Sequence, residues 1–300
     1  MYPKRALTAP RFAAIALLLL CGSPLGAAVD PAYVKQIEKW RQEFDADVRT
    51  GGWLTLVGRM KLDGRMWTLG SDPLSTIPLP SQAPAHLGVL RRQAEQIRFE
   101  PARGTNVTVD GTPTVAAVEL STKTGRGKIQ AQGLELHVRL VGGDPYLFVI
   151  DPNTAAVAAF KGTNWYPIDP VYRISATFEP YPHERLESVP LTHVESKESF
   201  PSTGDVIFQL NGRAIRLKTF IDEGQLFVMF LDETNGRGTY GGGRFLHAPL
   251  PRNGQTILDF NKAFNPYCSL NPNVMCPIPP SGNRLSLKVS AGETFTPEPW

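Results

Sequence analysis

Apolar positions along the chain change their spacing at Gly51-Gly52. Before this pair, apolar residues recur every three or four positions, the spacing of one face of an amphipathic helix: Val34, Ile37, Trp40, Phe44 and Val48. Asp30-Pro31 supplies a capping side chain and a proline at the first helical position. We therefore predict a helix over residues 29–50 that packs across a sheet, although such a face can also bind a partner.

After Gly52 the period becomes two, with short runs of alternating apolar and polar residues separated by Gly, Pro or Asp. Three dipeptides that tolerate positive φ mark candidate hairpins, namely Asp63-Gly64, Asp110-Gly111 and Asn211-Gly212. No second segment shows strong helical spacing. The pattern predicts a mainly β protein, with antiparallel sheets arranged as a barrel or sandwich and one N-terminal amphipathic helix.

The same pattern suggests how the chain is divided. Residues 1–28 form a targeting segment, 29–50 the helix, 51–185 a β-rich scaffold region and 186–300 a β-rich C-terminal region. The boundary between the last two rests on polar, proline-bearing sequence at residues 180–204. These two regions are either separate domains or parts of one.

The N-terminus has the composition of an export signal. Three cations precede a short apolar run at residues 12–20, and small residues follow as far as Ala28. The run is about half the ~20 residues that span a bilayer, which favours a cleaved signal over a membrane anchor. Cys21 invites comparison with lipid-modified cysteines, but Leu20 stands where a small residue is usual. We expect a periplasmic or secreted protein, cleaved after Ala28 and without an integral membrane segment thereafter.

Cleavage changes the charge balance. Removing Lys4, Arg5 and Arg11 lowers the 31 basic residues to 28 (31 − 3), against 28 acidic ones, none of which lies before Val29. The mature chain is then formally neutral. Because nucleic-acid binding depends on clustered positive charge, we do not expect a nucleic-acid partner.

Two cysteines remain after cleavage, Cys268 and Cys276. In an oxidising compartment an even pair predicts a structural disulfide, here one that braces a proline-rich segment. A metal site or a nucleophilic thiol is the alternative. Two ligands at this spacing do not make a zinc motif, and the five histidines show no metal spacing, so we expect no metal.

Glycines concentrate at residues 236–243, where Gly236, Gly238 and Gly241 match GxGxxG after a predicted strand. A dinucleotide site needs a helix directly afterwards, whereas Arg244-Phe245-Leu246 reads as a new strand. The glycines therefore predict a wide turn, or a backbone surface open to a ligand, and no cofactor.

Polar residues around this turn form the candidate site. They are Asp232, Thr239, Tyr240, Arg244, Asp259, Asn261 and Asn265. Asp232 and Asp259 both lie at strand ends, and antiparallel pairing could bring them together with Arg244 between them. Two carboxylates and a guanidinium could perform acid–base chemistry or bind a polar ligand. Equally, they could form a buried network that holds glycine-rich turns.

The order of these motifs resembles a known family. The segments that carry the resemblance are FLDETNGRGTYGGGRFL, LDFNKAFNPYC, CPIPPSGNRL with the AGE that follows it, GWLTLVGRMKLDG and FKGTNWYPIDPVYRISATFEPY. They are similar to segments of the bacterial and archaeal domain of unknown function numbered 1684. The resemblance spans about residues 35–293. It implies no activity, but it suggests that the Tyr240/Arg244 and Asp259/Asn261/Asn265 stretches form one site.

Three functions follow as hypotheses. The first is a binding module in which Thr239, Tyr240, Arg244, Asn261 and Asn265 engage a small polar or sugar-like ligand. The second is a hydrolase or lyase with Asp232 and Asp259 as acid and base and Arg244 stabilising developing charge. The third is a cell-envelope structural factor. The sequence indicates neither a substrate nor an oligomeric state.

Overall fold

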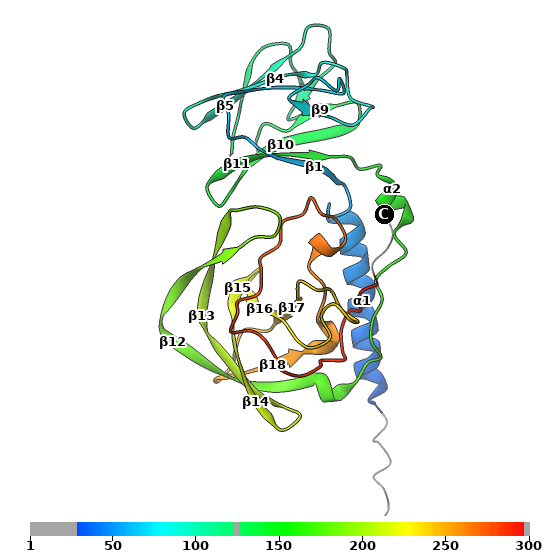
Figure 1. The fold of residues 1–300 in the computed structure, drawn as a ribbon. Helices are drawn as coiled ribbons and strands as arrows, with labels where there is room; N and C mark the ends of the chain where they lie inside the picture. The colour runs from blue at the N-terminus through cyan, green and yellow to red at the C-terminus, as the bar shows by residue number, and fades with distance from the viewer. Residues whose placement is uncertain (1–28, 123–125, 297–300) are drawn as a thin grey trace, which may run out of the picture.

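The computed structural model describes residues 29–122 and 126–296. The predicted signal segment, including Cys21, lies outside these residues. Figure 1 shows two lobes, with one long helix running along the side of the lower lobe. The fold is mainly β, with several antiparallel sheets and an N-terminal helix, as predicted. In the described ranges each sheet is open and none closes into a barrel.

Helix α1 (Pro31–Thr50) follows the predicted pattern. The Asp30 side chain accepts a hydrogen bond from the Ala32 amide at 2.9 Å, which caps the first turn. Ile37, Phe44 and Val48 are buried against the lower lobe. The helix begins at Pro31, directly after the Asp30 cap and two residues inside the predicted range of 29–50, and it ends before Gly51 as predicted.

The upper lobe contains two sheets that enclose one apolar core. The first sheet has the order β1 (Leu56–Lys61), β11 (Asp144–Ile150), β10 (Leu134–Val141), β9 (Ile129–Ala131), β6 (Thr108–Val109), β7 (Thr112–Pro113). The second has the order β3 (Ile77–Pro78), β2 (Met66–Gly70), β4 (Gly88–Gln93), β5 (Gln96–Pro101), β8 (Val118–Leu120). Alternate residues of these strands, such as Leu90, Phe99 and Leu136, are fully buried between the sheets.

The lower lobe also contains two sheets. The larger has the order β14 (Arg213–Lys218), β13 (Lys197–Leu210), β12 (Arg173–Pro190), β18 (Gln255–Asp259), and the smaller has the order β15 (Phe220–Asp222), β16 (Gln225–Phe230), β17 (Arg244–Ala248). Short helical turns complete the lobe: α2 (Ala155–Ala159), η1 (Pro170–Tyr172), η2 (Phe260–Lys262) and η3 (Tyr267–Ser269). Irregular backbone over residues 277–296 passes beside these sheets and contributes Leu285, Val289 and Ala291 to the core.

Two of the three predicted hairpins are present. Asp110-Gly111 joins β6 to β7, and Asn211-Gly212 joins β13 to β14, with Leu210 opposite Arg213. The hairpin predicted at Asp63-Gly64 is wrong, because β1 pairs with β11 while β2 pairs with β4. Here the chain crosses from one sheet of the upper lobe to the other, a choice that local turn chemistry does not reveal.

The hydrophobic clusters show where the lobes divide. The core of the upper lobe is drawn from residues 57–149. The two clusters of the lower lobe combine residues 40–56, from α1 to the first residue of β1, with residues from Ala156 onward. The boundary predicted between residues 185 and 186 falls within β12, which pairs with β13 on both sides of it. No helix in the described ranges is both long and apolar enough to cross a membrane.

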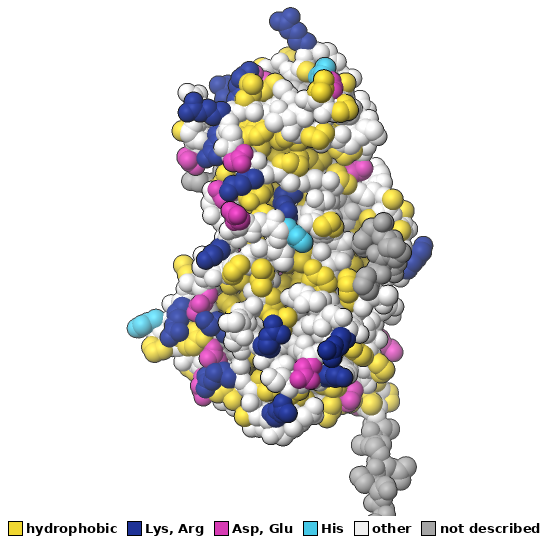
Figure 2. All heavy atoms as spheres, viewed as in Figure 1, with side chains coloured by type: hydrophobic (Ala, Val, Ile, Leu, Met, Phe, Trp, Pro, Cys, Tyr) yellow, Lys and Arg dark blue, Asp and Glu magenta, His cyan; other side chains and the backbone are white. Residues whose placement is uncertain are grey.

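The face shown in Figure 2 narrows between the lobes and carries basic and acidic side chains close to one another. Several charges on the surface of the lower lobe are paired. Arg216 lies 2.6 Å from Glu179 and 3.1 Å from Asp205, and Lys218 lies 2.6 Å from Glu187. Exposed pairs of this kind contribute little stability, so the charged surface does not explain the fold.

Candidate functional site

Asp232 and Arg244 form an ion pair in the core of the lower lobe. The register of β16 and β17 places Phe230 opposite Arg244, which brings the end of one strand beside the start of the next. The Arg244 Nη2 atom lies 2.6 Å from Asp232 Oδ2, and both side chains have no exposed surface. Arg244 also donates to the carbonyls of Val289 (2.8 Å) and Ala291. This pair has no contact with solvent and binds the backbone of residues 289–291 to the sheet.

The glycine-rich turn is organised around the same aspartate. Asp232 Oδ1 accepts hydrogen bonds from the Thr234 amide (2.7 Å) and hydroxyl (2.6 Å). The hydroxyls of Thr234 and buried Thr239 share a hydrogen bond of 2.8 Å. Gly243 has φ of +100°, and a Cβ there would lie 2.7 Å from the Phe230 carbonyl, so this position requires glycine. The turn leads into β17, as predicted, and so lacks the helix of a dinucleotide site.

Asp259 and Asn261 belong to a second network. Asp259 accepts a hydrogen bond from the Tyr33 hydroxyl of α1 at 2.9 Å. The Asn261 side chain accepts from the Asp169 amide at 2.9 Å and donates to the Asp169 carbonyl at 2.8 Å. Burial raises the pKa of Tyr33, and the charge of Asp259 raises it further. These residues bind the first turn of α1 to β18, and their hydrogen bonds do not include Asp232 or Arg244.

Trp165 packs within the lower lobe. Its ring lies edge-on to Trp40 and Phe44, with centroids 5.6 Å and 5.5 Å away. The Arg41 guanidinium covers the Trp165 ring, 4.8 Å from its centroid. Trp165 therefore holds α1 in place.

Asn265 connects the glycine-rich turn to the last segment of the lobe. Its side chain accepts from the Tyr240 amide at 3.2 Å and donates to the Thr294 carbonyl at 3.0 Å. Its own amide donates to Glu293 Oε2 at 2.7 Å. The Tyr240 ring packs edge-on to Phe295, with centroids 5.2 Å apart. Two predicted site residues thus position residues 293–295.

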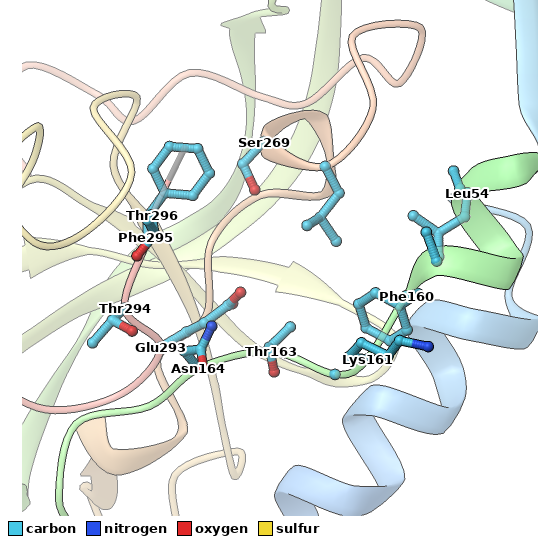
Figure 3. A pocket seen from close by; sticks show the side chains of 14 residues that line it. Leu54, Phe160, Lys161, Thr163, Asn164, Ser269, Glu293, Thr294, Phe295 and Thr296 are labelled. Atoms are coloured by element: carbon cyan, nitrogen blue, oxygen red, sulfur yellow. The ribbon is translucent and has the colours of Figure 1, made fainter. Parts of the chain in front are cut away.

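Residues 293–296 form one wall of a cavity of about 430 Å³. The other walls come from α2 with Leu54, from residues 160–164, and from η3 with Leu270. Figure 3 shows this cavity, with Glu293 and Ser269 pointing toward its middle from different walls. The volume falls within the range of small-molecule sites, about 300–1,000 Å³.

Glu293 is the most unusual titratable group in the wall. Only 3% of its surface is exposed. Its pKa is raised to about 8, chiefly by burial and also by the charge of Asp45, against the lowering effects of Asn265 hydrogen bonds and of the Arg244 charge. The carboxyl is therefore mostly protonated at neutral pH and can donate a hydrogen bond. Sequence reasoning did not select Glu293, although it ends the AGE motif.

The rest of the cavity wall is partly apolar and partly polar. The Ser269 hydroxyl is buried and has no hydrogen-bond partner in the described part of the chain. Phe160 and Phe295 contribute half-buried aromatic rings, while Thr163 and Thr294 contribute hydroxyl groups. The Phe295 amide donates to the Gly238 carbonyl at 2.9 Å, so the glycine-rich turn supports this wall.

The predicted disulfide is wrong. Cys268 and Cys276 are both free and buried, and they are neighbours without a bond between sulfurs. The Cys268 amide donates to Cys276 Sγ at 3.2 Å, and the Cys276 amide donates to Thr192 at 3.0 Å. These contacts hold the two thiols in place beside each other. A hydrogen bond from Cys276 lowers the pKa of Cys268 to about 7, and the same bond, with burial, raises that of Cys276.

Residues 158–294 match the family described as "Protein of unknown function (DUF1684)". The chain belongs to the DUF1684 family. The matched range includes the glycine-rich turn, the Asp232–Arg244 pair, the two cysteines and most of the cavity wall. The upper lobe and α1 lie outside it.

A comparison with solved structures found similarity to the solution NMR structure of an uncharacterized protein from Haloarcula marismortui. The two chains are 32% identical, and the match covers 46% of this DUF1684 chain and 78% of the other, with a TM-score of 0.40. No match was found among curated proteins.

Proposed function

We propose that this DUF1684 protein binds a small polar or sugar-like ligand in the cavity beside the glycine-rich turn. The observation that carries the proposal is the position of Glu293, a buried carboxyl group that points into the cavity and whose raised pKa favours its neutral form at neutral pH. Burying an acid in this way costs free energy unless a partner uses it, and perturbed titratable groups in cavities favour a functional site.

The remaining wall suits such a ligand. Sugars present hydroxyl groups at their edges and apolar C–H faces above and below the ring. Phe160 and Phe295 supply apolar surface for those faces, and Thr163, Thr294 and Ser269 supply hydroxyl groups for the edges. Binding sites commonly combine a mostly apolar wall with a few polar groups in this way.

The residues selected from the sequence then have supporting roles. Tyr240 and Asn265 position residues 293–295, while Thr239, Asp232 and Arg244 hold the turn behind them. Asp232 is paired and buried, and Asp259 belongs to another network. This arrangement favours a binding module over a hydrolase or lyase that uses the two aspartates as acid and base.

A screen for ligands tests the proposal. Protein purified after expression of the full chain would be heated with sugars, peptidoglycan fragments, nucleotides and divalent metals, and its Tm recorded. We expect sugars or their fragments to raise the Tm, because a ligand that binds the folded state stabilises it. Phe160→Ala should abolish the rise. Phe148→Ala, which removes a half-buried ring from β11 in the upper lobe, is the matched control and should retain it.

Two results would contradict the proposal. One is the absence of any shift with all four classes of compound, which would favour the structural factor. The other is a shift that Phe160→Ala preserves, which would place the ligand elsewhere.

We also propose that the protein is exported and cleaved after Ala28, on the strength of the N-terminal composition. The mass of the protein recovered from the periplasm or medium checks this. A mass that begins at Val29 is expected. A mass that retains residues 1–28, or a cysteine-linked lipid at Cys21, would overturn it.

A further inference from the structure

Glu293 can present a hydrogen-bond donor to the cavity. Its Oε2 atom accepts the Asn265 amide at 2.7 Å, so this oxygen acts as an acceptor. When the carboxyl is protonated, the proton therefore belongs on the other oxygen. Figure 3 shows the side chain extending from its wall toward the middle of the cavity.

Ser269 offers a second polar group from the opposite wall. Its hydroxyl oxygen is buried and lacks a partner among the described residues, and Figure 3 shows it directed toward the same space as Glu293. Buried hydroxyl groups are nearly always hydrogen-bonded. A ligand atom between the two walls would supply the missing hydrogen-bond partner for Ser269 and would accept a hydrogen bond from the protonated carboxyl of Glu293.

Charged ligands fit this pair poorly. The ammonium of an amino sugar would need Glu293 to ionise in a buried place. A carboxylate would need a cation, but Arg244 already pairs with Asp232, and the exposed Lys161 amine points away from Glu293 in Figure 3. A neutral carbonyl oxygen can accept hydrogen bonds from both Glu293 and Ser269, and it requires neither an ionised Glu293 nor a nearby cation.

The wall beside these donors is apolar. Leu54, Ala156 and Ala159 line the α2 side of the cavity and present only methyl and methylene groups. An acetamido group combines a neutral carbonyl with a methyl group, which matches one polar and one apolar surface in the same cavity.

We propose that the ligand is an N-acyl sugar, whose amide carbonyl accepts hydrogen bonds from Glu293 and Ser269 and whose acyl methyl packs against Ala156 and Ala159. This inference rests on the proposed function and names the class of ligand for that site. It predicts that binding depends on the protonated form of Glu293.

Several charged groups influence the titration of Glu293. Asp45 on α1 disfavours its ionisation, and Arg244 on β17 favours it. Tyr267 in η3 also interacts with Glu293, and the raised pKa of this tyrosine keeps it neutral in the relevant range. Lys161 lies at the wall of the cavity. Two groups near the cavity have a pKa in the range of the titration, namely Glu293 at about 8 and Cys268, the neighbour of Ser269, at about 7. A variant that removes only the Glu293 carboxyl distinguishes between them.

Calorimetric titration with three sugars tests the proposal. N-acetylglucosamine, glucose and glucosamine differ only at the 2-position, so their affinities isolate the acyl group. At about pH 6 we expect N-acetylglucosamine to bind at least about tenfold more tightly than the other two, the effect of one good hydrogen-bonded group. This advantage should fall as the pH rises through the Glu293 pKa of about 8.

Variants separate ligand recognition from folding. Glu293→Gln keeps an oxygen for the Asn265 amide and an N–H donor for the ligand, so it should retain the preference and lose its dependence on pH. Ser269→Ala should weaken N-acetylglucosamine about tenfold and leave glucose unchanged. Each variant must show the Tm of the parent protein within a few degrees before its affinity is compared.

Different failures have different meanings. The N-acyl assignment is overturned if glucosamine binds most tightly, or if all three sugars bind equally at both pH values. The proposed cavity is still the binding site in that case if Phe160→Ala abolishes the binding. If none of the three sugars binds but another compound raises the Tm through Phe160, the ligand class is wrong and the site stands. If no compound binds at all, the proposed function fails as well.

Discussion

Arg244 shows how one residue can carry charge in a core. Its guanidinium is fully buried, pairs with Asp232, donates to the carbonyls of Val289 and Ala291, and lies over the Phe230 ring at 5.2 Å. Two buried charges are tolerated because each satisfies the other and both terminal nitrogens of the guanidinium donate to backbone carbonyls, whereas its Nε has no partner among the described residues. We interpret the pair as part of the architecture behind the cavity.

Replacing this arginine tests that interpretation. Arg244→Ala should lower the free energy of unfolding by about 3–5 kcal/mol, because Asp232 is left buried without a counter-charge. Arg216→Ala is the control. Its side chain is 52% exposed, and loss of its pairs with Glu179 and Asp205 should cost less than about 1 kcal/mol. Urea unfolding measures both. A loss below that of Arg216→Ala would contradict the structural role.

Glu293 makes stability depend on pH. Its folded pKa of about 8 lies above its ordinary value of 4.5, so between these values the folded state binds more protons than the unfolded state. The stability contributed by the neutral acid is therefore fully present below about pH 4.5 and is lost as pH rises through about 8. Compared with Glu293→Gln, the parent protein should lose stability over this window in urea unfolding. Parallel pH profiles for the two proteins would show that the carboxyl is not shifted.

At the scale of elements, α1 joins parts of the chain that are far apart. Phe44 packs against Phe264 and Trp165, with ring centroids 5.2 Å and 5.5 Å away, and Tyr33 binds Asp259. Asp45 accepts hydrogen bonds from the Thr163 amide (3.0 Å) and hydroxyl (2.6 Å), so the helix also holds residues that line the cavity. Packing of this face supplies most of the stability of such a helix.

Truncating the buried face should release the helix. Phe44→Ala is expected to cost about 3–5 kcal/mol through lost apolar contact and a cavity. Glu43→Ala, one position away with a side chain 62% exposed, should change stability by less than about 0.5 kcal/mol. Chemical unfolding monitored by far-UV circular dichroism measures the difference. Similar values for both variants would mean that the helix is not packed as described.

At the scale of the whole molecule, two lobes meet through polar contacts. Arg59 of the upper lobe donates to the Asn273 carbonyl at 3.0 Å, and the Tyr146 and Ser196 hydroxyls share a hydrogen bond of 3.3 Å. The apolar core of the upper lobe shares no residue with the two clusters of the lower lobe, and only Leu56, at the start of β1, packs against one of the latter. Interfaces of this type resemble transient ones, so each lobe is expected to unfold with some independence.

Calorimetry should therefore resolve two unfolding transitions. Phe99→Ala removes a fully buried ring from the upper core and should lower only one of them, whereas Phe260→Ala should lower only the other. Each loss is expected to be about 3–5 kcal/mol. A single transition that both variants shift equally would show that the lobes unfold as one unit.

The sequence by itself determined the features that depend on neighbouring residues. The limits of α1 follow from the Asp30 cap and Gly51, and the turns at Asp110-Gly111 and Asn211-Gly212 follow from residues that tolerate positive φ. The mainly β fold follows from the alternation of apolar and polar residues along the strands. Family membership follows from the order of motifs in residues 158–294.

Only the tertiary structure decided which of these elements meet. Asp63-Gly64 is a dipeptide typical of hairpin turns, yet the strands on either side of it belong to different sheets, because β1 pairs with β11 and β2 pairs with β4. Asp232 and Asp259 both lie at strand ends, yet they belong to separate networks. Cys268 and Cys276 are neighbours held by backbone contacts without a bond. Glu293 carries no local signal of its raised pKa, because that shift comes from burial among residues distant in the chain.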